Sequence, residues 1–136
     1  MTTKIFSKIN PNILLHMIVR DIPEGRINLC PDDQFLQVAT LNLPSGTSFK
    51  AHQHNWNIVD TEARIAQECW IVISGGVKVY HYDLDGTLLQ IANIWPGDAS
   101  ITFQGGHNYL ILERDTRVYE IKTGPYKGQE LDKTFL

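Results

Sequence analysis

Short β-type segments, each ended by a turn, fill this sequence from residue 35 onward and restrict what it can fold into. The runs ECWIVIS, VKVYHYDLDG and TLLQIANIW are followed by or end in Gly-Gly, Asp-Gly and Pro-Gly-Asp, residue types that favour chain reversal. No convincing amphipathic helix interrupts them. Roughly eight to ten strands at this spacing are typical of an antiparallel sandwich or barrel, so the sequence predicts an all-β fold.

The first 34 residues and the C-terminal stretch carry weaker signals. NILLHMIVR could form a short helix or a strand, and GRINLC is interpreted as an edge strand. The stretch TGPYKGQELDKTFL is rich in glycine and charge and is expected to form a strap over the surface. A chain of 136 residues with 43% hydrophobic content is expected to form one domain with its own core.

Composition argues against several classes of partner. The net charge of −3 and the absence of a long Lys/Arg run argue against nucleic acid. No apolar run approaches the roughly 20 residues that span a bilayer, and MTTKIFSKIN lacks the apolar core of a signal peptide, so a cytoplasmic protein without a membrane partner is expected. Cys30 and Cys69 lie far apart and outside any C-x-x-C pattern, which argues against a disulfide framework or a thiolate zinc site.

Two histidines in FKAHQHNW, His52 and His54, are the first candidates for chemistry. On an extended strand, side chains at positions i and i+2 project from the same face, roughly 7 Å apart, so two imidazoles can converge on one ion. The same spacing also occurs on solvated strands. The pair alone therefore permits a metal site without establishing it.

The residues around this pair resemble the first motif of the cupin superfamily. In GTSFKAHQH five residues separate Gly46 from the His-x-His pair, and in ECWIVISG six residues separate Glu68 from Gly75, which are the two halves of that motif. Thirteen residues, NWNIVDTEARIAQ, separate the halves where the superfamily usually has three or four.

The second cupin motif is matched more loosely by GDASITFQGGH. Gly97, Gly105 and His107 agree with it. Phe103 replaces a proline, one residue rather than two separates Gly105 from His107, and Ile111 stands where asparagine is expected.

The resemblance implies a small single-domain cupin, a jelly-roll barrel over about residues 36–113, with the terminal segments packing on it. It also implies one metal ion held by His52, His54, Glu68 and His107. Glu62 is the alternative carboxylate, and we favour Glu68 because it keeps the distance to the Gly75 turn. Three imidazoles and one carboxylate suit a divalent transition metal ion such as Fe, Mn, Ni, Zn or Cu.

Further residues are candidates for substrate binding and catalysis. Arg64, in phase with Glu68, could bind an anionic group, or it is a solvated loop arginine. His81 and Trp70 are candidates for the pocket wall, with a core role as the alternative for each. Tyr109 shares the parity of His107 and, with Glu68, is a candidate for proton transfer, although packing is the alternative.

Fold alone does not name a reaction. The ligand set suits a metal-dependent enzyme for a small polar metabolite. The stretch YEIKTGPYKGQELDK resembles the C-terminal stretches of small single-domain cupins of sugar and surface-polysaccharide biosynthesis, which implies a sugar or sugar acid as substrate. Isomerisation or epimerisation is slightly favoured over dioxygenation. The alternative is a non-catalytic or metal-independent binder of a sugar-like ligand. A homodimer is also expected, because small jelly rolls expose strand edges that a neighbour's terminal segments can cover.

Overall fold

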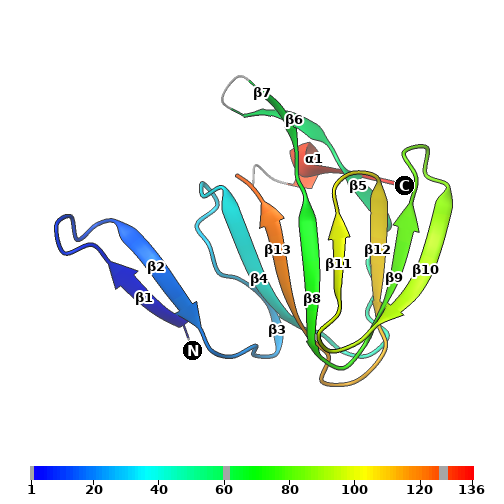
Figure 1. Ribbon diagram of the computed structural model, residues 1–136, viewed down its shortest axis with the longest axis horizontal. Coiled ribbons are helices and arrows are strands. Elements are labelled where there is room, and N and C mark those ends of the chain that lie inside the picture. The colour runs from blue at the N-terminus through cyan, green and yellow to red at the C-terminus, as the bar shows by residue number, and fades with distance from the viewer. Residues whose placement is uncertain (1, 60–61, 126–128) are drawn as a thin grey trace.

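The computed structural model describes residues 2–59, 62–125 and 129–136, and nearly all of its regular structure is β-strand (Figure 1). The elements, in chain order, are β1 (Thr2–Phe6), β2 (Leu14–Val19), β3 (Gly25–Asn28), β4 (Leu36–Asn42), β5 (His52–His54), β6 (Trp56–Val59), β7 (Glu62–Ile65), β8 (Glu68–Ser74), β9 (Val77–Tyr82), β10 (Leu88–Ile94), β11 (Ala99–Thr102), β12 (Gly106–Ile111), β13 (Arg117–Thr123), α1 (Gln129–Asp132) and β14 (Lys133–Phe135).

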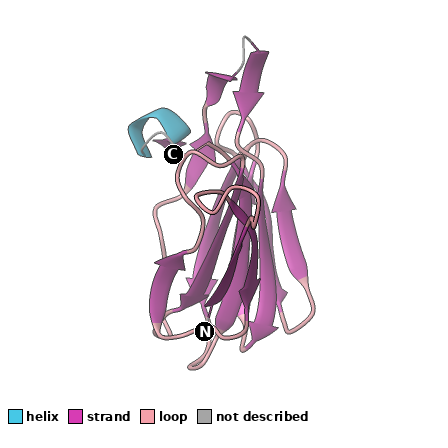
Figure 2. Ribbon diagram, turned by 90° about the vertical axis from the view of Figure 1, so that its left-hand side faces the viewer, coloured by secondary structure: helices cyan, strands magenta, loops and turns pink. Residues whose placement is uncertain are grey.

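Two five-stranded antiparallel sheets make up the body of the molecule, and the view in Figure 2 shows their strands running side by side along its length. Their strand orders are β10-β9-β12-β5-β14 and β11-β8-β13-β4-β3. Strands that are distant in sequence are neighbours in both sheets, as in a jelly roll. The predicted all-β jelly roll is therefore confirmed.

The core lies between the two sheets and follows from the alternation of side chains along each strand. In β8, Glu68, Trp70 and Val72 are buried while the residues between them face outward. These three residues therefore share the inner face of the strand. The same alternation in the strands that face or flank β8 completes the cluster, which comprises Ala39, Leu41, Trp70, Val72, Val77, Val79, Tyr109, Ile111 and Val118.

Two glycines show why the chain needs this residue type where it turns. Gly75 has φ of 77°, and a Cβ atom there would overlap Thr116. Gly105, just before β12, has φ of 87°, and a Cβ atom would lie 2.7 Å from the carbonyl oxygen of Tyr82. Any other residue would combine an unfavourable backbone conformation with a steric clash at either position.

The C-terminal segment is more than a surface strap. Within it, β14 adds an edge strand beside β5, while β13, which precedes it, lies at the centre of the other sheet. Both strands lie outside the range that the motifs cover.

One part of the N-terminal region joins a sheet of the body and another part forms a hairpin of its own. Strand β2 takes the extended alternative, and β3 forms the predicted edge strand. Strands β1 and β2 pair with each other as a separate hairpin that projects from the body (Figure 1). The described residues contain no helix long and apolar enough to cross a membrane.

Candidate metal centre and pocket

Three strands bring the four predicted ligands together. His52 and His54 lie on one face of β5, and the pairing of β12 with β5 places His107 directly opposite His52. Glu68 opens β8 in the facing sheet, so its carboxylate approaches from the other side. One ligand atom from each of these four buried residues lies within 4.8 Å of the others.

The other ring nitrogen of each histidine is occupied, which leaves Nε2 to face the centre. Nδ1 of His52 lies 2.9 Å from the carbonyl oxygen of Lys50, and Nδ1 of His54 lies 3.1 Å from Oδ1 of Asp132. Both partners accept hydrogen bonds, so these Nδ1 atoms carry the proton and the Nε2 atoms present lone pairs in the neutral rings. Nδ1 of His107 lies 2.9 Å from Oγ1 of Thr102.

The inward-facing nitrogen and oxygen atoms form few hydrogen bonds of good geometry with one another. Nε2 of His107 lies 3.1 Å from Nε2 of His52 and 2.7 Å from Oε2 of Glu68. Despite that short contact, Oε2 of Glu68 and Nε2 of His54 are buried without a hydrogen bond of good geometry. Unsatisfied buried polar atoms are rare, and a bound ion accounts for such a group. The chemistry and arrangement of these donors therefore fit a divalent transition metal.

The ionisation of these residues reflects the competition between burial and neighbouring charge. Burial lowers the pKa of His52 to about 4. Burial alone would do the same to His54, but the carboxylates of Asp132 and Glu68 outweigh it and raise its pKa to about 9. Burial likewise favours the neutral acid of Glu68, yet the facing rings of His107 and His54 hold its pKa well below the usual value. Glu68 is therefore a carboxylate at neutral pH.

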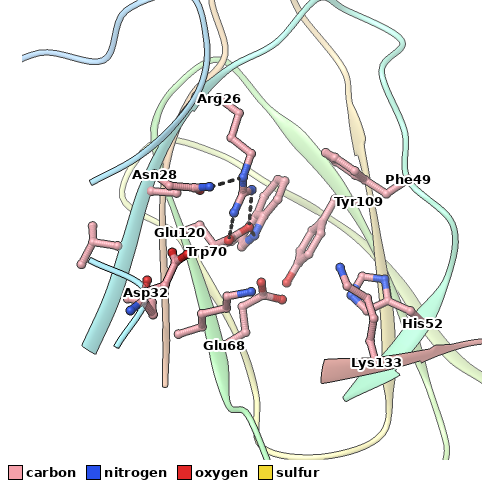
Figure 3. Close-up of a pocket in the computed structure, with 14 residues that line it drawn as sticks. Arg26, Asn28, Asp32, Phe49, His52, Glu68, Trp70, Tyr109, Glu120 and Lys133 are labelled. Carbon is pink, nitrogen blue, oxygen red and sulfur yellow. Dashed lines mark hydrogen bonds and ion pairs between the residues drawn. The ribbon is translucent and has the colours of Figure 1, made fainter. Parts of the chain in front are cut away.

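A cavity of about 270 Å³ opens beside His52 and Glu68 (Figure 3). Trp70 and Tyr109 form part of its wall, with their rings stacked at a centroid distance of 3.8 Å and 4° between the planes. Burial and the charge of Glu68 raise the pKa of the Tyr109 hydroxyl well above its usual value. Tyr109 therefore keeps its proton at neutral pH.

Charged side chains that the motifs did not reveal complete the cavity. Arg26 makes two hydrogen bonds to Glu120, at 3.1 and 2.6 Å, and Glu120 also accepts one from Nε1 of Trp70 at 3.0 Å (Figure 3). Lys133 lies beside His52 at the cavity wall, and Lys122, which also lines it, lies 3.6 Å from Asp132. No sequence motif marks these residues, because they are far from the histidines along the chain.

Two other candidates lie apart from this cavity. Arg64 is on the β6–β7 hairpin, which forms within the long insertion, and lines a second cavity of about 260 Å³ with Trp56 and Phe35. His81 on β9 is directly opposite His107, and its Nε2 lies 2.9 Å from the hydroxyl of Ser100. Neither residue is part of the wall of the first cavity.

The remaining candidate is Glu62, the alternative carboxylate ligand. Its backbone belongs to β7, but its side chain is outside the described part of the structure. The described ligand cluster contains Glu68.

Solved structures with the same arrangement of strands are numerous. KdgF from Halomonas sp. is 21% identical with a TM-score of 0.56, and the match covers 82% of this chain and 89% of that one. Oxalate decarboxylase from Bacillus subtilis is 18% identical with a TM-score of 0.57, over 83% of this chain and 28% of that one. An RmlC-like cupin protein from Desulfovibrio desulfuricans is 13% identical with a TM-score of 0.53, over 74% and 80%.

These likenesses concern the fold, since all three identities are low. This chain spans less than a third of the oxalate decarboxylase chain, and more than four fifths of KdgF. No protein-family model and no curated protein sequence matches this chain. The strand order, the facing sheets and the structural neighbours together show that this chain has the cupin fold.

Proposed function

We propose that this chain is a metal-dependent enzyme acting on a small polar metabolite, with His52, His54, Glu68 and His107 holding one divalent transition metal ion. The observation that carries the proposal is the convergence of four buried ligand atoms within 4.8 Å beside a cavity. When bound, such an ion supplies Lewis-acid polarisation of a substrate hydroxyl or carbonyl.

The residues of the chain divide the remaining work. Tyr109 keeps its proton because its pKa is raised well above the usual value, so its hydroxyl can donate a hydrogen bond to a substrate oxygen on which negative charge develops. Glu68 stays ionised and serves as the anionic ligand. Trp70 forms an apolar wall against which the carbon skeleton of a small substrate can rest.

A sugar or sugar acid suits this cavity best. Its wall mixes the Trp70 and Phe49 rings with amide and charged groups, as polyhydroxylated ligands require. Lys133 places a positive charge beside the metal ligands, where it can bind a substrate carboxylate. Oxalate decarboxylase, which has a similar fold, acts on a carboxylate, as its name states. Isomerisation or epimerisation of such a substrate is our first choice of reaction, ahead of dioxygenation.

Elemental analysis of the purified protein tests the metal. We expect close to one transition-metal ion per chain, and almost none in the His52→Ala, His54→Ala double variant, which should still fold because a core of this size does not need the metal. Full metal content in the folded double variant would reject the site.

Proton exchange tests the reaction. In D2O, isomerisation or epimerisation by proton transfer replaces hydrogen with deuterium at the carbon beside the substrate carbonyl, which NMR detects across a panel of sugars and sugar acids. Tyr109→Phe should slow this exchange by roughly 100-fold without removing the metal. Ligand binding without turnover of any panel member would instead indicate a non-catalytic binder, and a substrate-dependent uptake of O₂ would indicate a dioxygenase.

A further inference from the structure

The long insertion, residues 55–67, builds a cavity that is separate from the candidate metal centre. It contains the β6–β7 hairpin, which extends beyond the ends of the two main sheets (Figure 1). The second cavity, of about 260 Å³, lies between this insertion, the loop before β4, the end of β13 and α1. A long connection in a compact domain is more often functional than idle, and this one forms much of a cavity wall.

Asp132 separates the second cavity from the first. Among the described residues, none lines both cavities. Asp132 lines the second cavity, while its carboxylate lies 3.1 Å from Nδ1 of His54 and 3.6 Å from Nζ of Lys122, which lines the first cavity. A ligand in the second cavity would therefore meet groups other than those that face the proposed substrate.

Two aromatic side chains are open to this cavity. Trp56 is 59% exposed and Phe35 is 52% exposed, and both line it. Aromatic rings that face a concave surface offer a flat apolar ring a place to pack. The volume is sufficient, since a cavity of about 150 Å³ already holds benzene.

Arg64 adds a positive charge beside these rings. Its guanidinium carbon lies 6.0 Å from the centroid of the Phe35 ring, and the residue lines the same cavity. A guanidinium group is always protonated and binds a carboxylate through two parallel hydrogen bonds. Because the Asp132 carboxylate lines the cavity as well, a ligand group with one negative charge suits it better than a phosphate with up to two.

Several polar side chains of this cavity already make hydrogen bonds within the chain. The side-chain amide of Asn57 donates to the carbonyl oxygen of Leu131 at 2.7 Å, and Oγ1 of Thr123 accepts from the amide of Gln67 at 2.9 Å. These bonds tie the insertion to α1 and β13, so the cavity is formed before a ligand arrives. They also leave few partners for the hydroxyl groups of a sugar, which favours an aromatic ligand here.

We propose that this cavity is a second binding site of the chain, and that its ligand is a small aromatic acid with one ring and one carboxylate. The ring packs against Trp56 and Phe35, and the carboxylate binds Arg64. The site needs neither the metal ion nor the proposed reaction, because its walls contain none of the four candidate metal ligands.

Titration of the metal-free full chain, in chelator, tests the proposal with benzoate, phenylacetate and 3-phenylpropionate. Calorimetry should show saturable binding of at least one of these acids with a Kd below about 1 mM. The NMR signal of the Trp56 indole N–H, assigned by its absence from the Trp56→Phe variant, should shift during the titration. Benzyl alcohol, which lacks the charge, and acetate, which lacks the ring, should each bind at least about 10-fold more weakly than the best acid. Phenyl phosphate should also bind more weakly than benzoate.

Variants of exposed residues locate the bound acid. Arg64→Ala should weaken binding by about 10-fold or more, and Arg64→Lys should recover only part of that loss, because an ammonium group cannot form the bidentate contact. Trp56→Ala should weaken binding by a similar factor. Arg114→Ala, which removes an exposed arginine from the turn between β12 and β13, is the matched control and should bind as the wild type does. Lys133→Ala controls for the first cavity and should also leave the affinity unchanged.

Three results would overturn the proposal. The first is the absence of saturable binding of all three acids to the folded wild-type chain. The second is an affinity that Arg64→Ala leaves unchanged. The third is binding that Lys133→Ala abolishes while Arg64→Ala retains it, which would place the acid in the first cavity. Tighter binding of phenyl phosphate than of benzoate would overturn the assignment of a carboxylate.

Discussion

At the scale of single residues, the candidate metal centre depends on a carboxylate that no motif includes. Asp132 accepts a hydrogen bond from Nδ1 of His54, and its own pKa is lowered because the contact with His54 outweighs the effect of burial. This contact fixes which nitrogen of His54 faces the centre and increases its basicity, as outer-shell carboxylates do in metal sites.

We therefore predict that Asp132→Ala weakens metal binding about 10- to 100-fold. The metal affinity of Asp132→Asn should lie between those of Asp132→Ala and the wild type. The asparagine oxygen can still accept the hydrogen bond but carries no charge. Titration calorimetry with Zn²⁺ or Ni²⁺ measures the dissociation constants. Asp85→Asn, which alters an exposed carboxylate in a turn, is the control. Equal affinities for all four proteins would contradict the assignment.

A second prediction at this scale compares two cations. Lys133 lines the cavity beside His52, while Arg64 lines the second cavity. If the substrate carries a carboxylate, Lys133→Ala should raise KM or ligand Kd. The expected loss of binding free energy is roughly 1.5–3 kcal/mol, the usual worth of a hydrogen bond to a charged partner. Metal content should not change. A larger effect of Arg64→Ala would instead assign the anion to the long insertion.

At the scale of elements, the short strand β14 supports the strand that carries two ligands. It pairs with β5 so that Phe135 is opposite His52 and Lys133 is opposite His54. The amide of Leu136 donates to the carbonyl oxygen of Ala51 at 2.9 Å. Strand β5 is only three residues long, so its position depends on neighbours on both sides.

Removing residues 134–136 should therefore lower the free energy of unfolding by about 2 kcal/mol, since several hydrogen bonds of about 1 kcal/mol each are lost. It should also weaken metal binding, because β5 loses one neighbour. Urea denaturation and calorimetry measure the two effects separately. A truncated chain with unchanged metal affinity would show that pairing with β12 alone fixes β5.

At the scale of the whole molecule, buried histidines couple folding to pH. In the metal-free protein His54 has a folded pKa of about 9, above its ordinary 6.5, so its stabilising contribution is complete below pH 6.5 and is lost as the pH rises to 9. His52 has a folded pKa of about 4, so the unfolded chain gains its proton first, and stability falls as the pH drops from 6.5 to 4.

We predict that the Tm of the metal-free protein, measured in chelator between pH 5 and 9, is highest near pH 6.5. A saturating metal ion takes the place of the proton on His54, so the loss of stability above pH 6.5 should disappear in the loaded protein. The His54→Gln substitution should also remove this alkaline loss of stability from the metal-free protein. An alkaline loss of the same size in that variant would show that another group is responsible.

Interactions between near neighbours in sequence were predictable. Glycine conformations and strand alternation are local properties of the backbone, so the turn at Gly75 and the buried parity of Glu68, Trp70 and Val72 follow from the sequence. The candidate ligands His52 and His54 follow from the same period-two geometry. The sequence by itself thus determined the fold class and which strands bear ligands.

Only the tertiary structure decided what surrounds those ligands. Asp132 reaches His54 across 78 residues, and Arg26 reaches Glu120 across 94, because β14 lies beside β5 and because β3 is an edge strand of its sheet. The structure likewise separates Arg64 from the first cavity and leaves the β1–β2 hairpin uncovered. These outcomes depend on strand order and on which sheet faces receive which side chains. A local pattern does not contain them, because they arise when segments far apart in sequence pack together.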